Sequence, residues 1–381
     1  MTRDIWIAPD RLFDGRDLHD GAALRLRNGT ATEIAARAPA QARRVAGLLV
    51  PGFLDLQVNG GGGVMLNSQP DADGMRTIAA AHRRFGTVAL LPTLISDTAD
   101  QMDRAVDAAI ATRGEPGIAG LHLEGPHIAP DRRGTHARTV LRRLDEHTLD
   151  AVARLRRHGI AVLITVAPEA ATPEQIAALT NLGAVVSLGH SDCDAAAAQA
   201  ALAAGATAFT HLFNAMSQMT HRAPGMVGTA INSDAYCGII CDGHHVAYEM
   251  VGLALRARPR RDRMLLVSDA MATVGGPDSF DLYGQTITLR DGQLVNAEGS
   301  LAGAHTTMLD GVAGLVSHVG VPLDEALRMA TAIPAEAIRL PALGRITDRR
   351  TEDLLLLSPD LDLVGTLADA LAATPLAHAG E

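Results

Sequence analysis

The chain alternates apolar runs with amphipathic or alanine-rich stretches, and this alternation restricts its fold more than any other feature. The apolar runs lie at 48–58, 87–96, 118–126, 160–169, 184–191, 206–216, 236–245 and 264–271. The stretches between them are typical of helices; one example is CDAAAAQAALAAG, where Gly205 is placed to end the helix. Strands that alternate with helices form parallel βαβ units, and eight such units close a barrel. An open, doubly wound sheet is the competing interpretation.

Polar residues near the ends of these runs favour the closed barrel. They are Asp55, Gln57, Asn59, Glu124, Glu169, His190, His211, Asn214, His244, His245 and Asp269. A barrel enzyme draws its active site from the loops after all eight strands, whereas an open sheet concentrates such residues at one switch point. We therefore expect an α/β fold with a (β/α)8 TIM-type barrel whose site lies at the carboxyl ends of its strands.

Both ends of the chain are β-like, and neither is long enough to fold alone. Residues 1–48 contain short alternating runs such as ALRLRNG, and residues 345–381 have a similar character. We predict that these two segments form one small β-sandwich domain, and that residues 49–344 form a metal-dependent hydrolase barrel.

Composition excludes several classes of function. A net charge of −10 argues against nucleic acid or an anionic membrane as a partner. Cys193, Cys237 and Cys241 are odd in number and lack a CxxC pair, so a disulfide framework is not expected. The sequence shows no signal-peptide core and no membrane-length apolar run, which predicts a cytoplasmic protein. It also contains no lysine, which excludes Schiff-base chemistry and a carboxylated lysine between two metals.

Glu124, His190 and His211 are the candidate metal ligands. They stand in the contexts HLEGPH, LGHSD and THLFNAM, each at the end of an otherwise apolar run. Any one histidine is explained as well by hydrogen bonding without a metal, but burying the three together without a counter-ion costs several kcal/mol. Two imidazoles and one carboxylate leave a coordination position open for water, whose pKa zinc lowers to roughly 7.

Three further residues are candidates for chemistry around that metal. Asp269, in LLVSDAM, is placed to exchange a proton with the water, although an aspartate after a strand often only caps the next helix. His136 lies in the loop EGPHIAPDRRGTHA, from which an imidazole can polarise a substrate carbonyl. Arg222, in QMTHRAPG, can bind a carboxylate or phosphate, with simple solvent exposure as the alternative. We interpret Asp55 and Glu169 as structural.

Several motifs together resemble the N-acetylglucosamine-6-phosphate deacetylases of the amidohydrolase superfamily. In chain order they are PGFLDLQVNGGGG, LHLEGPHIAPDRRGTH, LGHSD, THLFNAMSQMTHRAPG, DGHHV, VSDAM and GSLAGAHTTM, spread over about residues 50–345. The resemblance implies hydrolysis of N-acetyl-D-glucosamine 6-phosphate to D-glucosamine 6-phosphate and acetate, in amino-sugar metabolism. It also implies a terminal β-domain split between the two chain ends.

The resemblance assigns a role to each candidate residue. Glu124, His190 and His211 become the metal ligands, Asp269 the general base and acid, and His136 the group that polarises the carbonyl. The implied contacts to the sugar phosphate come from Asn214, Ala215, Arg222, His245 and Met308. Arg222 is expected to reach the site of a neighbouring subunit, which implies a homodimer.

The sequence also departs from the pattern of many amidohydrolases. Gln57 and Asn59 stand where others carry a histidine pair for a second metal. We therefore expect one divalent metal ion per subunit, with zinc preferred and iron, cobalt and manganese as alternatives. His244 stands beside His245 where an apolar residue is usual, so which of the two faces the sugar stays open at this point. His221 and His305 also replace small residues.

Two other activities and one non-enzymatic role fit the same motifs. N-acetylgalactosamine 6-phosphate or an unphosphorylated acetamido sugar are alternative substrates. A sugar-phosphate-binding sensor on the same barrel is the alternative outside enzymes. The complete ligand set together with Asp269 argues against the sensor, because a binding module needs no proton shuttle.

Overall fold

The computed structural model describes residues 4–297, 299 and 301–373, and its centre is an eight-stranded parallel barrel. In spatial order the barrel strands are β6 (Phe53–Val58), β9 (Thr87–Ile95), β11 (Gly120–Glu124), β12 (Ala161–Val166), β13 (Val185–Leu188), β14 (Ala208–Phe209), β15 (Tyr236–Ile239) and β16 (Met264–Leu266). The ring closes just beyond β16, where Val58 and Ala270 form a parallel bridge. The expected barrel is confirmed, with one strand from each of the eight apolar runs.

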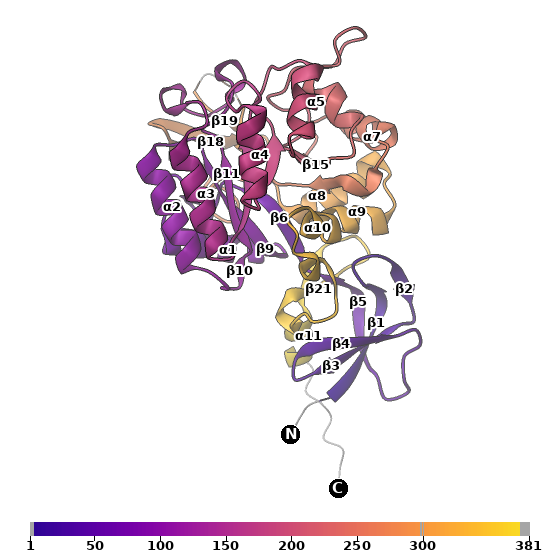
Figure 1. Ribbon diagram of the computed structural model, residues 1–381. Coiled ribbons are helices and arrows are strands. Elements are labelled where there is room, and N and C mark those ends of the chain that lie inside the picture. Colours follow the sequence, from indigo (N-terminus) through magenta and orange to yellow (C-terminus); the bar gives the residue numbers. More distant parts are fainter. Residues whose placement is uncertain (1–3, 298, 300, 374–381) are drawn as a thin grey trace.

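Helices cover the outside of the barrel (Figure 1). They are α1 (Ala72–Arg83), α2 (Ala99–Ala111), α3 (Glu146–Arg157), α4 (Pro173–Asn181), α5 (Ala195–Ala203), α6 (Gly225–Ile231), α7 (Tyr248–Ala257), α8 (Met308–Gly314), α9 (Leu323–Ala330) and α10 (Ala332–Ala337). Side chains at the N-caps define where α1 to α5 begin; for example, the Asp145 carboxylate accepts the Thr148 N–H at 3.0 Å. Gly205, with a φ of 116°, follows α5 as predicted.

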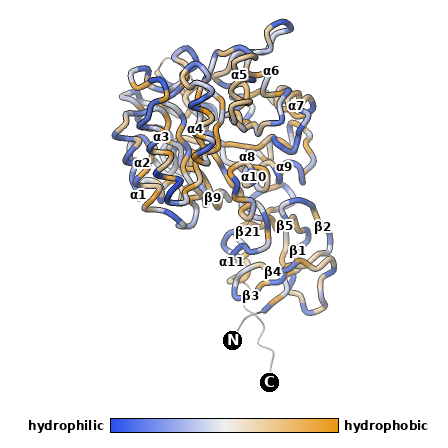
Figure 2. Tube along the Cα trace, in the orientation of Figure 1, coloured by the Kyte–Doolittle hydropathy of each residue, from blue (hydrophilic) through white to orange (hydrophobic). Residues whose placement is uncertain are grey.

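The barrel strands are buried on both faces, which explains their continuous apolar character. All nine residues of β9 are buried between the helices and the barrel interior. Figure 2 shows the apolar segments concentrated inside the barrel and the hydrophilic ones on its outer surface. In the part of the chain that the structure describes, no helix combines the length and apolar character needed to cross a membrane.

A second sheet is built from both chain ends, which lie together below the barrel in Figure 1. Its strands are β1 (Asp4–Phe13), β2 (Leu18–Asp20), β3 (Ala23–Arg27), β4 (Thr30–Ala35), β5 (Arg43–Pro51), β21 (Leu354–Leu357) and β22 (Leu363–Thr366), with α11 (Leu367–Ala373) packed beside them. β21 runs antiparallel to β5, so the two chain ends are hydrogen-bonded to each other. The first apolar run is therefore shared, since β5 belongs to this sheet and β6 to the barrel.

A four-stranded antiparallel sheet between β16 and α8 was not expected from the sequence. It consists of β17 (Ser279–Leu282), β18 (Gln285–Arg290), β19 (Gln293–Val295) and β20 (Leu301–Ala304). Its apolar face packs on Met271, which follows β16. The hydroxyl of Tyr283, in the turn after β17, donates to the Ser96 carbonyl at the end of β9. This sheet therefore lies against the carboxyl end of the barrel.

Three short strands remain among the described residues. They are the hairpin strands β7 (Gly60–Gly61) and β8 (Val64–Met65), and β10 (Gly117–Ile118).

Candidate active site

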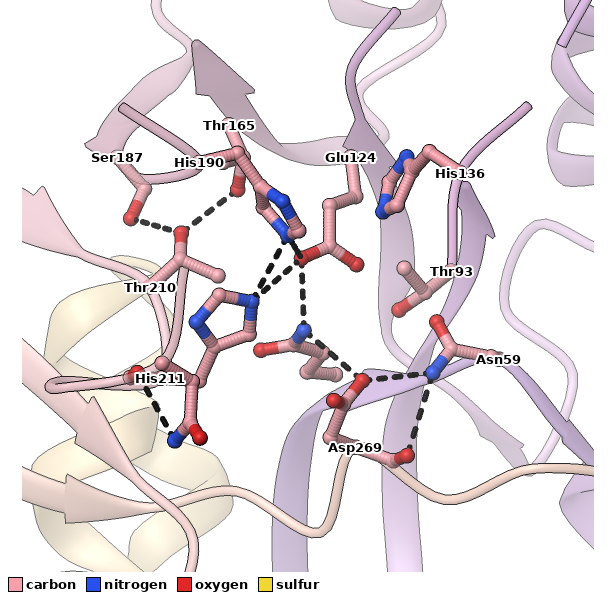
Figure 3. A network of polar contacts seen from close by, with 12 residues as sticks. Asn59, Thr93, Glu124, His136, Thr165, Ser187, His190, Thr210, His211 and Asp269 are labelled. Carbon is pink, nitrogen blue, oxygen red and sulfur yellow. Dashed lines mark hydrogen bonds and ion pairs between the residues drawn. The ribbon is translucent and has the colours of Figure 1, made fainter. Parts of the chain in front are cut away.

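Glu124, His190 and His211 converge at the carboxyl end of the barrel (Figure 3). Glu124 is the last residue of β11, and the two histidines follow β13 and β14 by two residues. Glu124 Oε1 lies 3.2 Å from His190 Nε2 and 3.0 Å from His211 Nε2, and the two Nε2 atoms are 3.0 Å apart. All three side chains are buried, so their ligand atoms face one small volume rather than solvent.

The hydrogen bonds of His190 show that this convergence suits a cation. Its Nδ1 lies 2.8 Å from the Arg132 carbonyl and donates to it, so the other ring nitrogen, Nε2, is the one directed at Glu124 and His211. Two imidazole nitrogens and a carboxylate oxygen facing one point form a donor set for a divalent metal. The residues present therefore fit a divalent metal ion.

The charge on Glu124 is maintained by its histidine neighbours. Burial alone raises the pKa of Glu124, but the hydrogen bonds and charges of His190 and His211 outweigh burial and hold that pKa well below its ordinary value. Glu124 is therefore an ionised ligand, as metal binding requires.

Asp269 lies beside this group, three residues beyond β16. Its Oδ1 accepts hydrogen bonds from Asn59 Nδ2 at 2.7 Å and from Gln57 Nε2 at 3.0 Å. Burial and the nearby charge of Glu124 raise the pKa of Asp269. Asp269, His190 and His211 all have positive φ values, of 52°, 49° and 29°, a conformation that costs non-glycine residues of order 1–3 kcal/mol each. Such strain clusters where side-chain direction matters for function.

His136 presents one defined nitrogen to the site. The backbone N–H of Ser96 points at His136 Nδ1 at 3.2 Å, and the Ser96 hydroxyl lies 2.7 Å from the same atom. Because a backbone N–H always carries its proton, Nδ1 must be an acceptor, and the ring proton sits on Nε2. Burial and the neighbouring His190 also hold the pKa of His136 well below its ordinary value. His136 is therefore a neutral hydrogen-bond donor, with its ring centre 4.5 Å from that of His190.

These groups share one cavity of about 170 Å³. Its lining combines the polar side chains with backbone and apolar atoms from several loops: Asn59, Ile95, Glu124, Gly134, Thr135, His136, His190, His211, Asn214, Ala215, His245, Asp269, Met271, Leu301 and Gly303. A larger cavity of about 780 Å³, lined in part by Asp14 and Arg345, lies elsewhere and contains none of the candidate residues. The smaller cavity is the candidate active site because the metal-ligating group opens into it.

The structure distinguishes His245 from His244. His245 lines the cavity, and its Nδ1 lies 2.7 Å from Asp242 Oδ2. Burial lowers the pKa of His245, but the hydrogen bond and charge of Asp242 outweigh burial and raise it. His244 is exposed and accepts a hydrogen bond from Gln293, on β19, at 3.0 Å.

Two expected substrate contacts lie outside the cavity. Arg222 is exposed on the loop between β14 and α6, and its side chain does not line the cavity of its own chain. Met308 is the first residue of α8, is 1% exposed and packs in the barrel core. Of the two unusual histidines, His221 is exposed on the Arg222 loop and His305 hydrogen-bonds to Thr273 at 2.8 Å.

Asp55 and Glu169 occupy supporting positions. Asp55 is fully buried and accepts backbone N–H groups of Gln57 and Ser268, both at 3.2 Å. Burial raises the pKa of Asp55 to about 7. Glu169 accepts the Ser191 hydroxyl at 2.7 Å and so fixes the loop that carries His190.

Three supporting residues escaped the sequence interpretation. Ser96 fixes His136, Asp242 fixes His245, and Tyr283 holds the Ser96 carbonyl. Ser96 ends the apolar run 87–96 and Asp242 lies late in the run 236–245, which is the signal that identified the other site residues, but their partners are brought to them only by folding.

Comparison with known proteins agrees with this geometry. The amidohydrolase family model matches residues 48–375. The N-acetylgalactosamine-6-phosphate deacetylase of Shewanella sp. (strain ANA-3) is 40% identical over 348 residues, covering 90% of this chain and 87% of that protein. The N-acetylglucosamine-6-phosphate deacetylase of Haemophilus influenzae is 32% identical, with coverages of 84% and 85%.

Solved structures of N-acetylglucosamine-6-phosphate deacetylases also resemble this chain. The crystal structure of N-acetylglucosamine-6-phosphate deacetylase from Pasteurella multocida superposes with a TM-score of 0.88 at 33% identity, covering 96% of this chain and 98% of that one. A Mycobacterium smegmatis mutant enzyme in complex with N-acetyl-D-glucosamine-6-phosphate gives 0.87 at 30% identity, covering 95% and 97%. The chain belongs to the amidohydrolase family. Within that family it groups with the N-acetylhexosamine-6-phosphate deacetylases.

Proposed function

We propose that this protein is a metal-dependent deacetylase that converts an N-acetylhexosamine 6-phosphate and water into the hexosamine 6-phosphate and acetate. The observation that carries the proposal is the placement of Glu124, His190, His211 and Asp269 around one cavity, which joins a metal-ligating group to a proton acceptor. A sugar-phosphate sensor would need only the metal-ligating group and not the proton acceptor. Similarity to deacetylases over nearly the whole chain supports the same reaction.

Each group of site residues has a separate role in the proposed reaction. Glu124, His190 and His211 would hold the metal, which supplies Lewis-acid activation of water and carbonyl when bound. Asp269 takes a proton from the attacking water as the C–O bond forms and delivers a proton to the nitrogen as the C–N bond breaks. His136 donates from Nε2 to the carbonyl oxygen as negative charge develops there.

We propose one metal ion per subunit. Gln57 and Asn59 present amide nitrogens to Asp269 rather than lone pairs to a second cation, and the chain has no lysine to bridge two metals. Zinc is the preferred ion, and iron, cobalt and manganese also accept two nitrogens and a carboxylate oxygen.

The phosphate of the substrate has candidate partners on two subunits. Asn214, Ala215 and His245 line the cavity, and the raised pKa of His245 favours the charged form that attracts an anion. We propose a homodimer in which Arg222 of one subunit reaches the phosphate site of its partner, because Arg222 is exposed and does not line its own cavity.

The sugar epimer has two candidates. The sequence motifs favour N-acetylglucosamine 6-phosphate, whereas the 40% identity to the Shewanella N-acetylgalactosamine-6-phosphate deacetylase favours the galacto epimer. Acetate release measured as kcat/KM on both phosphorylated epimers, and on both unphosphorylated sugars, decides between them. We expect kcat/KM to be higher for the phosphorylated sugars than for the unphosphorylated sugars. Binding of phosphorylated sugars without acetate release would identify a sensor instead.

Replacing His136 tests the proposed carbonyl contact. We expect His136→Ala to lower kcat by about 100-fold, since removal of one oxyanion donor typically costs 10²–10³. Metal content should not change, because His136 is outside the ligand group. His147→Ala, at a half-buried histidine paired with Asp103 and outside the cavity, is the control and should keep full activity. A His136→Ala enzyme as fast as the control would remove this residue from the reaction.

Replacing Arg222 tests the phosphate contact across the dimer. Arg222→Ala should lower kcat/KM on the phosphorylated sugar by roughly 10- to 100-fold, the effect of losing a charge-assisted bidentate contact. Activity on the unphosphorylated sugar should stay the same. Arg113→Ala, at an exposed arginine beyond α2 at the opposite end of the barrel, serves as the control. Equal losses on both substrates would contradict the assignment.

A further inference from the structure

One carboxylate oxygen of Asp269 accepts hydrogen bonds from two side-chain amides at the end of β6. Asn59 Nδ2 donates to Asp269 Oδ1 at 2.7 Å and approaches the Asp269 carbonyl at 3.3 Å (Figure 3). Gln57 Nε2 donates to the same Oδ1 at 3.0 Å and to Glu124 Oε1 at 2.9 Å. Both amide side chains are almost completely buried, at 0% and 2% exposure.

The orientation of the Asn59 amide is set by Asp269. Its own carbonyl oxygen, Oδ1, is buried and has no hydrogen-bond partner among the described residues. Leaving a buried acceptor unpaired costs about 1–3 kcal/mol. A flip of the amide would place this oxygen against the Asp269 carboxylate, so the flipped orientation is no remedy for that cost. The amide therefore faces Asp269 because the carboxylate requires a donor there.

The orientation of Gln57 is fixed in a similar way. Its nitrogen lies between two carboxylates, Glu124 and Asp269, and has one hydrogen for each. A flipped Gln57 would place its oxygen between two negative charges. The Gln57 amide thus links Glu124 of the metal-ligating group to Asp269 by hydrogen bonds. The amide itself neither loses nor gains a proton.

The other oxygen of Asp269 is left free. Asp269 Oδ2 makes no hydrogen bond with a described residue, and Asp269 lines the cavity. With Oδ1 engaged by two donors, the carboxylate plane is held and Oδ2 is the oxygen available to a proton in the cavity.

We propose that Asn59 and Gln57 are positioning residues for Asp269, which fix its carboxylate so that Oδ2 alone exchanges the proton. This inference rests on the proposed function, in which Asp269 is the general base and acid. It assigns the two amides a task in proton transfer rather than in metal binding. Their loss should consequently change kcat far more than KM or metal content.

The first test removes the Asn59 donor without changing its shape. Asn59→Asp should lower kcat by about 10- to 100-fold, the range expected when a reacting group is misplaced by about 1 Å. KM and metal content per subunit should stay within about twofold of wild type. Gln57→Met, which keeps length and loses the donor, should act in the same direction.

Asn67→Asp is the matched control. Asn67 is also buried, and its Nδ2 donates to the Asp97 carboxylate at 2.8 Å, so the same chemical change is made at another carboxylate. If both variants lose activity equally, or if Asn59→Asp changes KM and leaves kcat alone, the positioning role is wrong.

A double-mutant cycle separates positioning from a general effect on folding. If Asn59 acts only through Asp269, Asn59→Asp should cost little further kcat in an Asp269→Asn background, because coupled residues are non-additive. Full additivity of the two losses would overturn the inference.

Thermal unfolding of the metal-free variants gives a readout independent of activity. Asn59→Asp sets a carboxylate against Asp269 and should lower the unfolding midpoint; Asp269→Asn should recover part of that loss by removing the repulsion. No recovery would contradict the contact. Wild-type protein is assayed beside the variants: absence of acetate from wild type refutes the proposed function, whereas active wild type with an unimpaired Asn59→Asp refutes only the positioning role.

Discussion

The Asp269→Asn variant is expected to keep its metal and to lose about 10³-fold in kcat, within the 10²–10⁴ range of general acid–base catalysis. Asparagine has the same shape, and its Oδ1 still accepts from Asn59 and Gln57, so the cavity should keep its form. It has no basic oxygen for the proton of the water and no proton for the leaving amine. Acetate release in the steady state and metal analysis of the same sample measure both halves of this prediction.

The control for this variant is Asp73→Asn, which changes an exposed aspartate paired with Arg76 on α1. It should retain wild-type kcat. If Asp269→Asn remained within about threefold of wild type, another group would have to move the proton. If it instead lost the metal, Asp269 would be a ligand rather than the acid and base.

Glu124→Gln is expected to abolish metal binding and reduce activity to the level of chelator-treated protein. Glu124 supplies the only negative charge in the ligand group, and its Oε1 contacts both His190 and His211. A neutral amide is a much weaker ligand for a divalent cation than a carboxylate, and it also brings an N–H group toward two imidazole nitrogens. Metal per subunit after dialysis against excess zinc is the direct measurement.

Thermal unfolding provides a second measurement for Glu124→Gln. An ion bound only by the folded state raises the unfolding midpoint by mass action, so added zinc should stabilise wild type and leave the variant unchanged. Glu115→Gln, at a half-buried glutamate paired with Arg76 and outside the metal-ligating group, is the control and should respond to zinc like wild type. A Glu124→Gln protein that still held one zinc per subunit would contradict the ligand assignment.

The barrel was predictable because its strands are buried on both faces, are mostly apolar, and carry the polar residues of the site near their carboxyl ends. The additional sheet was missed, although its turns carry a recognisable signal. Asp291–Gly292 joins β18 to β19, and both residues have positive φ, at 49° and 79°. An Asp-Gly pair between alternating strands is a strong hairpin indicator. The strands are short, and the longest, β18, is largely polar with only Ile287 buried, so the sheet lacks the continuous apolar runs that identified the barrel.

The metal group was predictable for the same reason as the barrel. Strand ends of a barrel meet at one face, so Glu124, His190 and His211 had to lie near one another once the strands were assigned. The choice between His244 and His245 was not predictable, since it depends on how Asp242 turns the loop and binds one of the two rings.

Contacts that depend on side-chain packing were also out of reach of the sequence. Met308 packs into the core because α8 begins there, whereas the motif around it suggested a contact with substrate. Ser96 could not be linked to His136, forty residues away, before the loop was placed. The contact of Arg222 with a partner subunit stays a prediction.

The most direct test is to measure acetate and free amine together, using protein reconstituted with zinc and each N-acetylhexosamine 6-phosphate. We expect acetate and hexosamine 6-phosphate in equal amounts, with kcat/KM on the order of 10⁴ M⁻¹s⁻¹ or more for at least one epimer. Chelator-treated protein should form neither product and should recover on addition of zinc. If the zinc-loaded protein released no more acetate than the chelated sample from either epimer, the assignment of this site as a deacetylase would be wrong.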